Sequence, residues 1–272
     1  MKDWRVTKIA ISMARIFAEK RLPRSAAALA YYLVLTLFPA IICIYDLLAL
    51  VLRNPGNVIA VVESLVLPRE TSELISEFLQ YVSGNTNRVL FFVALAVMVT
   101  SAAAAFRTFS AIAEEIQGSR RFAPVPNALV SFVFSLAFLL AVFVCILLML
   151  TGQHFLKLLD EVLPWVNIGG WWDWLRFVLL FAILLMMILI LYRLTAPREL
   201  RHRQLPGAFF SAVCVSAMSI LFSWLFGRSA KYSLVYGSLA SVVILMFWFN
   251  MFSTLILLGY AFNRAMEESR AK

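Results

Sequence analysis

Charged side chains are scarce in this chain. Only 14% of its 272 residues are Asp, Glu, Lys or Arg, whereas 62% are hydrophobic. Soluble globular domains carry about 25% charged and about 45–50% apolar residues, so this composition excludes that class. The mean hydropathy of +0.88 indicates instead a protein that crosses a membrane several times.

Cysteine and histidine are also rare. Cys43, Cys145 and Cys214 fall in three different hydrophobic segments, which excludes a disulfide framework and a clustered metal-ligand spacing. His154 and His202 lie on opposite sides of the predicted membrane and cannot share a metal. No Walker loop, Gly-rich dinucleotide turn or zinc signature occurs. We therefore predict no metal, no cofactor and no enzymatic activity.

Six hydrophobic segments are long enough to cross a bilayer, whose hydrocarbon core of about 30 Å needs about 20 helical residues. They cover residues 25–52, 89–116, 128–150, 176–194, 208–226 and 237–261. The predicted fold class is therefore an all-α membrane protein. We expect a six-helix transmembrane domain over residues 25–262 and a short cytoplasmic tail over residues 263–272.

Residues 1–24 precede the first span and have an amphipathic pattern. Ile9, Met13 and Phe17 recur at helical spacing, and basic residues lie on or beside the other face. This pattern fits a helix in the cytoplasmic membrane interface, and it fits equally a cytosolic helix packed on the protein. The segment has no uninterrupted apolar run, so we predict no cleaved signal peptide.

The opposite, outer side also shows amphipathic segments. Residues 58–66 and 70–82 look helical but are too short to cross a bilayer. Four tryptophans gather later in the chain, and such rings prefer the headgroup level. They are Trp165, Trp171, Trp172 and Trp174. We expect these segments at the outer interface.

Basic residues outnumber acidic ones by 24 to 15, a formal net charge of +9. In a membrane protein they first set topology and bind anionic headgroups, so the charge does not predict a nucleic-acid partner. With six spans, 17 basic residues fall on the side of both termini and seven on the other. Both termini are therefore predicted to be cytoplasmic.

The first span carries a stripe of small and polar residues. Its members are Ser25, Ala28, Tyr32, Thr36, Pro39, Cys43 and Asp46. Alternating steps of three and four place them on one narrow helix face. Pro39 removes a backbone hydrogen bond and collides with the Leu35 carbonyl, which predicts a kink. We expect the stripe to face protein or a wet cavity.

Two ionisable residues within spans are candidate site residues. Asp46 costs at least about 2.5 kcal/mol in a membrane interior, so it should face a cavity or a partner, unless it is wetted at the outer interface. Arg107 could bind a phosphate by two hydrogen bonds. Alternatively, it reaches the inner headgroups or pairs with Glu114.

Three further candidates have a structural alternative each. Tyr32 and Thr36 could line a polar path, but Thr36 could equally donate to the Tyr32 carbonyl. Asn250 could contact a substrate or hydrogen-bond between helices. Together with Pro39, Asp46 and Arg107, these residues are the predicted lining of a central cavity.

Several motifs resemble the YihY/BrkB family of bacterial membrane proteins, formerly labelled ribonuclease BN-like. They are Ser25-Ala-Ala-Ala-Leu-Ala-Tyr-Tyr-Leu-Val-Leu-Thr-Leu-Phe-Pro39, Leu205-Pro-Gly-Ala208, and Tyr236-Gly-Ser-Leu239 followed by Leu257-Leu-Gly259. The resemblance covers nearly the whole chain. It implies six membrane helices in the bacterial cytoplasmic (inner) membrane. It also implies an association with serum resistance and proposals of lipid or envelope-component transport, whereas the ribonuclease label is widely regarded as mistaken.

The leading functional hypothesis is a transporter or flippase. It would bind an amphipathic or anionic envelope molecule, such as a phospholipid or lipid-linked intermediate, in a central polar cavity open toward the outer side. Without an ATP motif, transport would be passive or ion-coupled, with Asp46 as a candidate proton carrier. The alternatives are a non-transporting scaffold or envelope-assembly partner, and a membrane-bound hydrolase. The expected partners are membrane lipids, and the oligomeric state is open.

Overall fold

The computed structural model describes residues 2–52, 77, 88–118, 124–162, 172–226 and 239–271. The predicted outer helices at 58–66 and 70–82, apart from Glu77, therefore lie outside the described residues. So do Trp165, Trp171 and the Tyr236-Gly-Ser part of one motif.

The described chain is helical throughout and contains no strand. Its elements are α1 (Lys2–Glu19), α2 (Leu22–Leu52), α5 (Arg88–Gln117), α6 (Pro124–Val162), α7 (Trp172–Thr195), the 3-10 helix η2 (Arg198–Arg203), α8 (Leu205–Phe226) and α10 (Leu239–Ala271). Six of them, α2, α5, α6, α7, α8 and α10, are long and apolar enough to cross a membrane. The predicted all-α fold with six transmembrane helices is confirmed.

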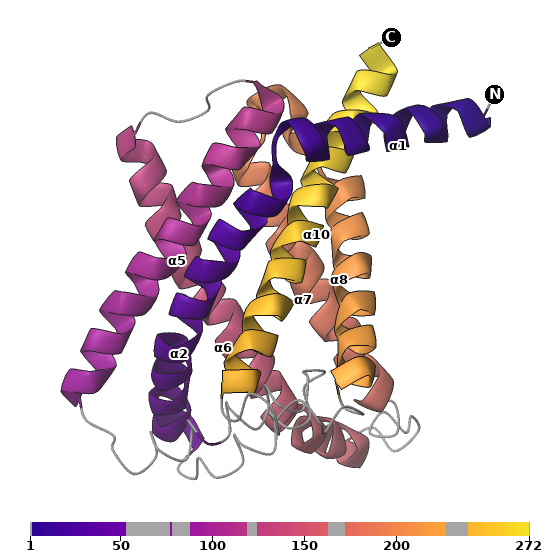
Figure 1. The fold of residues 1–272 in the computed structure, drawn as a ribbon. Coiled ribbons are helices and arrows are strands. Elements are labelled where there is room, and N and C mark those ends of the chain that lie inside the picture. The colour runs from indigo at the N-terminus through magenta and orange to yellow at the C-terminus, as the bar shows by residue number, and fades with distance from the viewer. Residues whose placement is uncertain are drawn as a thin grey trace.

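The six long helices run side by side, and both chain ends lie at one end of the bundle (Figure 1). We call this the termini end. Helix α1 lies across it and packs on the last turns of α10. Helix α2 packs mainly on α5 and α10, and α10 also packs on α8. Helices α2 and α10 are therefore the central pair of the bundle.

Helix α2 continues through Pro39, and its two halves run in different directions (Figure 1). The stripe predicted on this helix faces inward only in part, because Thr36 and Cys43 are buried whereas Ala28 is exposed. Since α2 packs on both α5 and α10, its buried surface is wider than one narrow stripe.

Glycine ends α5 by a backbone conformation that other residues rarely adopt. Gly118 has φ +73°, and its N–H donates to the Glu114 carbonyl at 2.8 Å. A hydrogen bond of this kind closes the last turn of a helix. The turn between α1 and α2 uses the same region of φ at Arg21, with φ 49°.

The core near the termini end is built around three aromatic side chains from three helices. Tyr192 of α7 stacks on Phe109 of α5, with ring centroids 6.0 Å apart and planes within 5°. Tyr260 of α10 meets both rings edge-on, at 5.2 Å from Tyr192 and 5.7 Å from Phe109. Such edge-to-face contacts are favourable arrangements for aromatic rings. They fix α5, α7 and α10 relative to one another.

Helices α8 and α10 approach backbone to backbone at Gly207 and Gly259. A Cβ atom added to Gly259 would lie 2.6 Å from the Gly207 carbonyl oxygen and would overlap the Ser211 hydroxyl. Only glycine therefore fits this crossing without displacement, as is common where membrane helices pack closely. Two of the sequence motifs, Leu205-Pro-Gly-Ala208 and Leu257-Leu-Gly259, thus meet in space.

Candidate functional site

A cavity of about 120 Å³ lies between α2, α5, α6, α7 and α10. Its lining consists of Leu29, Leu33, Thr36, Ala102, Ala105, Phe106, Phe109, Phe134, Phe138, Leu184, Met187, Ile188, Leu191, Phe252, Ser253 and Ile256. Thr36 and Ser253 are the two polar residues in this set. The sequence predicts a polar cavity beside the stripe. The cavity that Thr36 lines is apolar instead, because phenylalanines from three neighbouring helices form much of its wall.

Thr36 is the one predicted site residue that lines this cavity. Its side chain is 3% exposed, and its hydroxyl donates to the Tyr32 carbonyl at 2.7 Å. This bond confirms the structural alternative, because a threonine that returns its proton to its own helix offers only an acceptor to a ligand.

The other candidates on α2 do not line the cavity. Tyr32 is half-buried, with its ring edge-on to Tyr31 at 5.4 Å. Pro39 and Asp46 are also half-buried. Asp46 comes 24 residues after Leu22, about 36 Å along the helix, and therefore lies far from the termini end.

Arg107 and Asp46 belong to different levels of the bundle. Arg107 is exposed on α5, ten residues before Gln117 at the termini end, or about 15 Å along the helix. Asp46 is near the opposite end of α2. The structure therefore does not bring these two predicted site residues together.

Asn250 of α10 is half-buried, and its Oδ1 atom is buried without a hydrogen-bond partner. This oxygen therefore makes no hydrogen bond between helices, which was one of the two roles predicted for Asn250. Ser253, which follows one turn later, is 1% exposed, and its Oγ also lacks a partner. Sequence reasoning missed Ser253, although its spacing of three from Asn250 placed it on a shared helix face. Two unsatisfied polar atoms thus occupy successive turns of α10, and the Ser253 side chain lines the apolar cavity.

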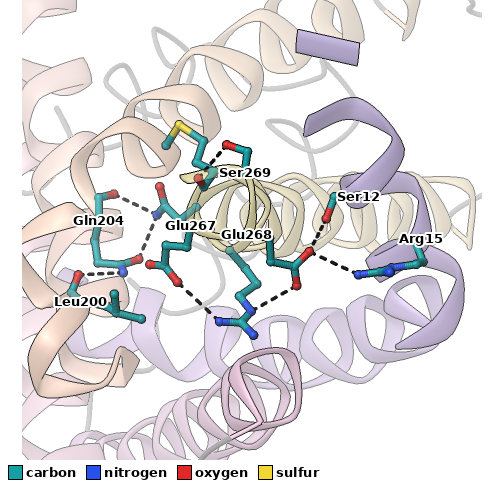
Figure 2. Close-up of polar contacts among 10 residues, drawn as sticks. Ser12, Arg15, Leu200, Gln204, Glu267, Glu268 and Ser269 are labelled. Carbon is teal, nitrogen blue, oxygen red and sulfur yellow. Dashed lines mark hydrogen bonds and ion pairs between the residues drawn. The ribbon is translucent and has the colours of Figure 1, made fainter. Parts of the chain in front are cut away.

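The start of α8 is tied to α10 by the Asn263 side-chain amide. Figure 2 shows the polar contacts of Gln204, the residue just before α8. Pro206 has no N–H to satisfy, and the Gly207 N–H donates to Asn263 Oδ1 at 2.7 Å. Asn263 Nδ2 donates in turn to the Gln204 backbone carbonyl and to Gln204 Oε1, at 3.1 and 2.9 Å. Asn263 therefore caps α8 from a neighbouring helix, a task usually performed by the residue just before the first turn.

Tyr192 and Ser211 form a second buried polar contact beside the glycine crossing. Their hydroxyl oxygens are 2.8 Å apart. Tyr192 donates to the Ile256 carbonyl, and Ser211 donates to the Leu255 carbonyl at 3.0 Å. These bonds join α7, α8 and α10 where the membrane offers no water to satisfy a polar group.

Helix α1 is held by Glu268 of α10 (Figure 2). The Glu268 Oε2 atom accepts from Ser12 Oγ at 2.7 Å and from an Arg15 terminal nitrogen at 3.2 Å. Arg264 Nε lies 3.5 Å from Glu268 Oε1. Ile16 of α1 is buried in the core below. Helix α1 thus packs on the protein, as one of the two alternatives for the N-terminal segment requires, and its place in the membrane interface stays a prediction.

Within the described ranges, no group of three or more His, Cys, Asp and Glu side chains could hold a metal ion.

Comparison with known proteins identifies the family of this chain. No solved structure matches the chain. A ribonuclease-like protein, YfkH of Bacillus subtilis (strain 168), is 26% identical over 251 residues, which cover 90% of each chain. The model of the Virulence factor BrkB family matches residues 13–272. Since that match covers nearly the whole chain, together with the six membrane-spanning helices, this protein is a member of the BrkB family.

Proposed function

We propose that this protein binds an amphipathic envelope lipid, takes up a stretch of its acyl chain in the central cavity, and carries the lipid within the membrane. The observation that supports this most directly is the apolar cavity with the unpaired Ser253 hydroxyl at its wall. An apolar lining favours hydrocarbon over a charged headgroup. The transported molecule is therefore recognised through its chain at this level of the bundle.

The cavity size sets how much of a lipid it holds. Apolar cavities of about 150 Å³ in other proteins bind benzene or xenon, and this cavity measures about 120 Å³. It thus accommodates several chain carbons at once rather than a whole lipid. The rest of the molecule would extend between the helices or into the bilayer.

The unsatisfied Ser253 hydroxyl gives the ligand a polar anchor at the cavity wall. A buried polar group without a partner costs about 1–3 kcal/mol. An ester carbonyl could accept from the Ser253 hydroxyl. Ser253 replaces Asp46 as the favoured contact, because Ser253 lines the cavity and Asp46 does not.

A cavity-filling variant tests the proposal. Ala105 lines the cavity, whereas Ala111 is exposed on the same helix. The protein is reconstituted with a phospholipid that carries a photoreactive group in its acyl chain. Ala105→Leu should reduce crosslinks to the lining segments of α6 and α7 several-fold, and Ala111→Leu should not. Equal crosslinking in both variants would refute binding in the cavity.

The same vesicles test movement with a fluorescent lipid and a membrane-impermeant quencher. The carrier function is supported if the unmodified protein moves the lipid across the membrane and Ala105→Leu moves it more slowly. If the lipid crosslinks to the cavity but does not move across the membrane, the carrier function is refuted and only lipid binding is supported.

The non-transporting scaffold remains the second candidate. It is favoured by the Thr36 hydroxyl, which is satisfied within α2 and gives the stripe a packing role. Catalysis is not part of either proposal. Glu114 and Glu115 point about 100° apart on α5, which is poor geometry for a shared site, and the ribonuclease-like name belongs to the Bacillus relative.

We further propose that the protein lies in a bacterial inner membrane with its termini end on the cytoplasmic side. The support is the excess of basic residues on that side, 17 against seven. In a variant without the three native cysteines, a cysteine in place of Arg203 should react with an impermeant maleimide only after the cells are opened. Labelling of intact cells would reverse the orientation.

A further inference from the structure

A basic groove of about 620 Å³ lies outside the central cavity, where α7 ends and η2 begins. Its lining consists of Ile190, Arg193, Leu194, Arg198, Arg201 and His202. Three arginines and one histidine thus line one concave surface. Glu199, which lies on η2 between the groove residues, is exposed and does not line the groove.

The groove is shaped by a contact across the turn between the two helices. The Arg201 Nε–H donates to the Arg193 carbonyl at 3.2 Å, in the last turn of α7. A cation near the C-terminus of a helix is favoured, because unpaired carbonyls carry partial negative charge there. The bond uses one of the five N–H donors of Arg201 and leaves four that could bind a ligand.

The groove continues into an apolar helix face that points away from the bundle. Ile190 is 38% exposed, and Met186, one turn earlier on α7, is 54% exposed. The apolar span of α7 runs from Trp174 to Thr195 and ends where the arginines begin. A cationic groove therefore lies directly above a hydrocarbon-facing stripe, at the level expected for lipid headgroups.

We infer that this groove binds the phosphate headgroup of an acidic membrane lipid, with one acyl chain along Ile190 and Met186. Guanidinium groups bind phosphate oxygens through paired hydrogen bonds, which favours phosphate as the ligand group. The apolar stripe favours a lipid over free phosphate, because only a lipid fills both surfaces. The site differs from the central cavity in every residue and does not depend on the proposed carrier function.

The test measures lipid affinity by native mass spectrometry of the full-length protein in detergent. Phosphatidylglycerol is titrated into the unmodified protein and into Arg198→Ala and Arg201→Ala. A matched control is Arg203→Ala, because Arg203 is an exposed arginine of the same η2 helix that does not line the groove. Phosphatidylcholine is titrated in parallel, and inorganic phosphate is added as a competitor.

Removal of either groove arginine should weaken the tightest phosphatidylglycerol binding about fivefold, and Arg203→Ala should leave it unchanged. The Arg201 side chain also bonds the backbone at the end of α7, so Arg201→Ala could disturb the local fold. Arg198→Ala tests the groove without removing that bond. Equal weakening by Arg203→Ala would overturn the site in favour of general charge attraction. Equal affinity for phosphatidylcholine, or displacement by inorganic phosphate at the same concentration as the lipid, would overturn the assignment to an acidic lipid.

Discussion

Gly207 and Gly259 meet where α8 crosses α10, so closely that a side chain on either residue would overlap the other helix. This contact positions the Tyr192–Ser211 pair and the Asn263 cap on either side of it. The packing of the termini end therefore depends on two residues without side chains.

Gly259→Ala should lower the melting temperature of the detergent-solubilised protein. The new methyl group would overlap Ser211 Oγ and approach the Gly207 carbonyl, and overpacking of this kind costs about 1–3 kcal/mol. Scanning fluorimetry measures the change, with Ala217→Val on the exposed side of α8 as the control. Alanine favours helix more than glycine does, so a rise in melting temperature would show that α10 can move away from α8.

Tyr192→Phe should destabilise the bundle modestly while keeping its aromatic contacts. The variant loses the hydroxyl that contacts Ser211 and Ile256, but Ser211 can still donate to the Leu255 carbonyl. Interhelical hydrogen bonds in membranes contribute about 0.6 kcal/mol on average and about 1.7 at most. Unfolding in mixed detergent measures the loss, and Tyr31→Phe on the exposed face of α2 is the control. An equal effect of both variants would argue against a role for this contact.

Asn263→Ala should be more destabilising than Asn250→Ala, although both remove an asparagine from α10. The Asn263 side chain accepts from Gly207 and donates to Gln204, whereas Asn250 Oδ1 has no partner. Loss of a helix cap costs about 0.5–2 kcal/mol. Unfolding midpoints of the two variants provide the measurement. The reverse order would contradict the assignment of Asn263 as the cap of α8.

Glu268→Ala should loosen α1 with little change in global stability. Arg15 is largely exposed, and exposed ion pairs contribute about 0–1 kcal/mol. Helix α1 nevertheless loses its bonds from Ser12 and Arg15 together. Hydrogen exchange of residues 7–19 should become faster, and Glu115→Ala on the exposed side of α5 should have no such effect. Unchanged exchange in Glu268→Ala would mean that Ile16 and its apolar neighbours hold α1 alone.

The candidate site was only partly predictable from the sequence. Helical periodicity correctly assigned Thr36 to a buried position, but it could not show that phenylalanines of α5, α6 and α10 surround it. Asp46 and Arg107 are charged residues within hydrophobic segments, which made them candidates, yet their positions along α2 and α5 place them at different levels of the bundle. Ser253 could not be singled out from the sequence, because it carries no charge and its role depends on a missing hydrogen bond that only the structure shows.

The sequence by itself determines the membrane architecture. Six long apolar segments must become helices, because a lipid interior leaves no other way to satisfy the backbone polar groups of each segment. The tertiary structure alone decides which side chains meet, such as Tyr192 with Ser211 and Asn263 with Gly207. Those pairs depend on the rotation and crossing of each helix, which are set by packing between helices and not by the hydrophobicity of any one of them.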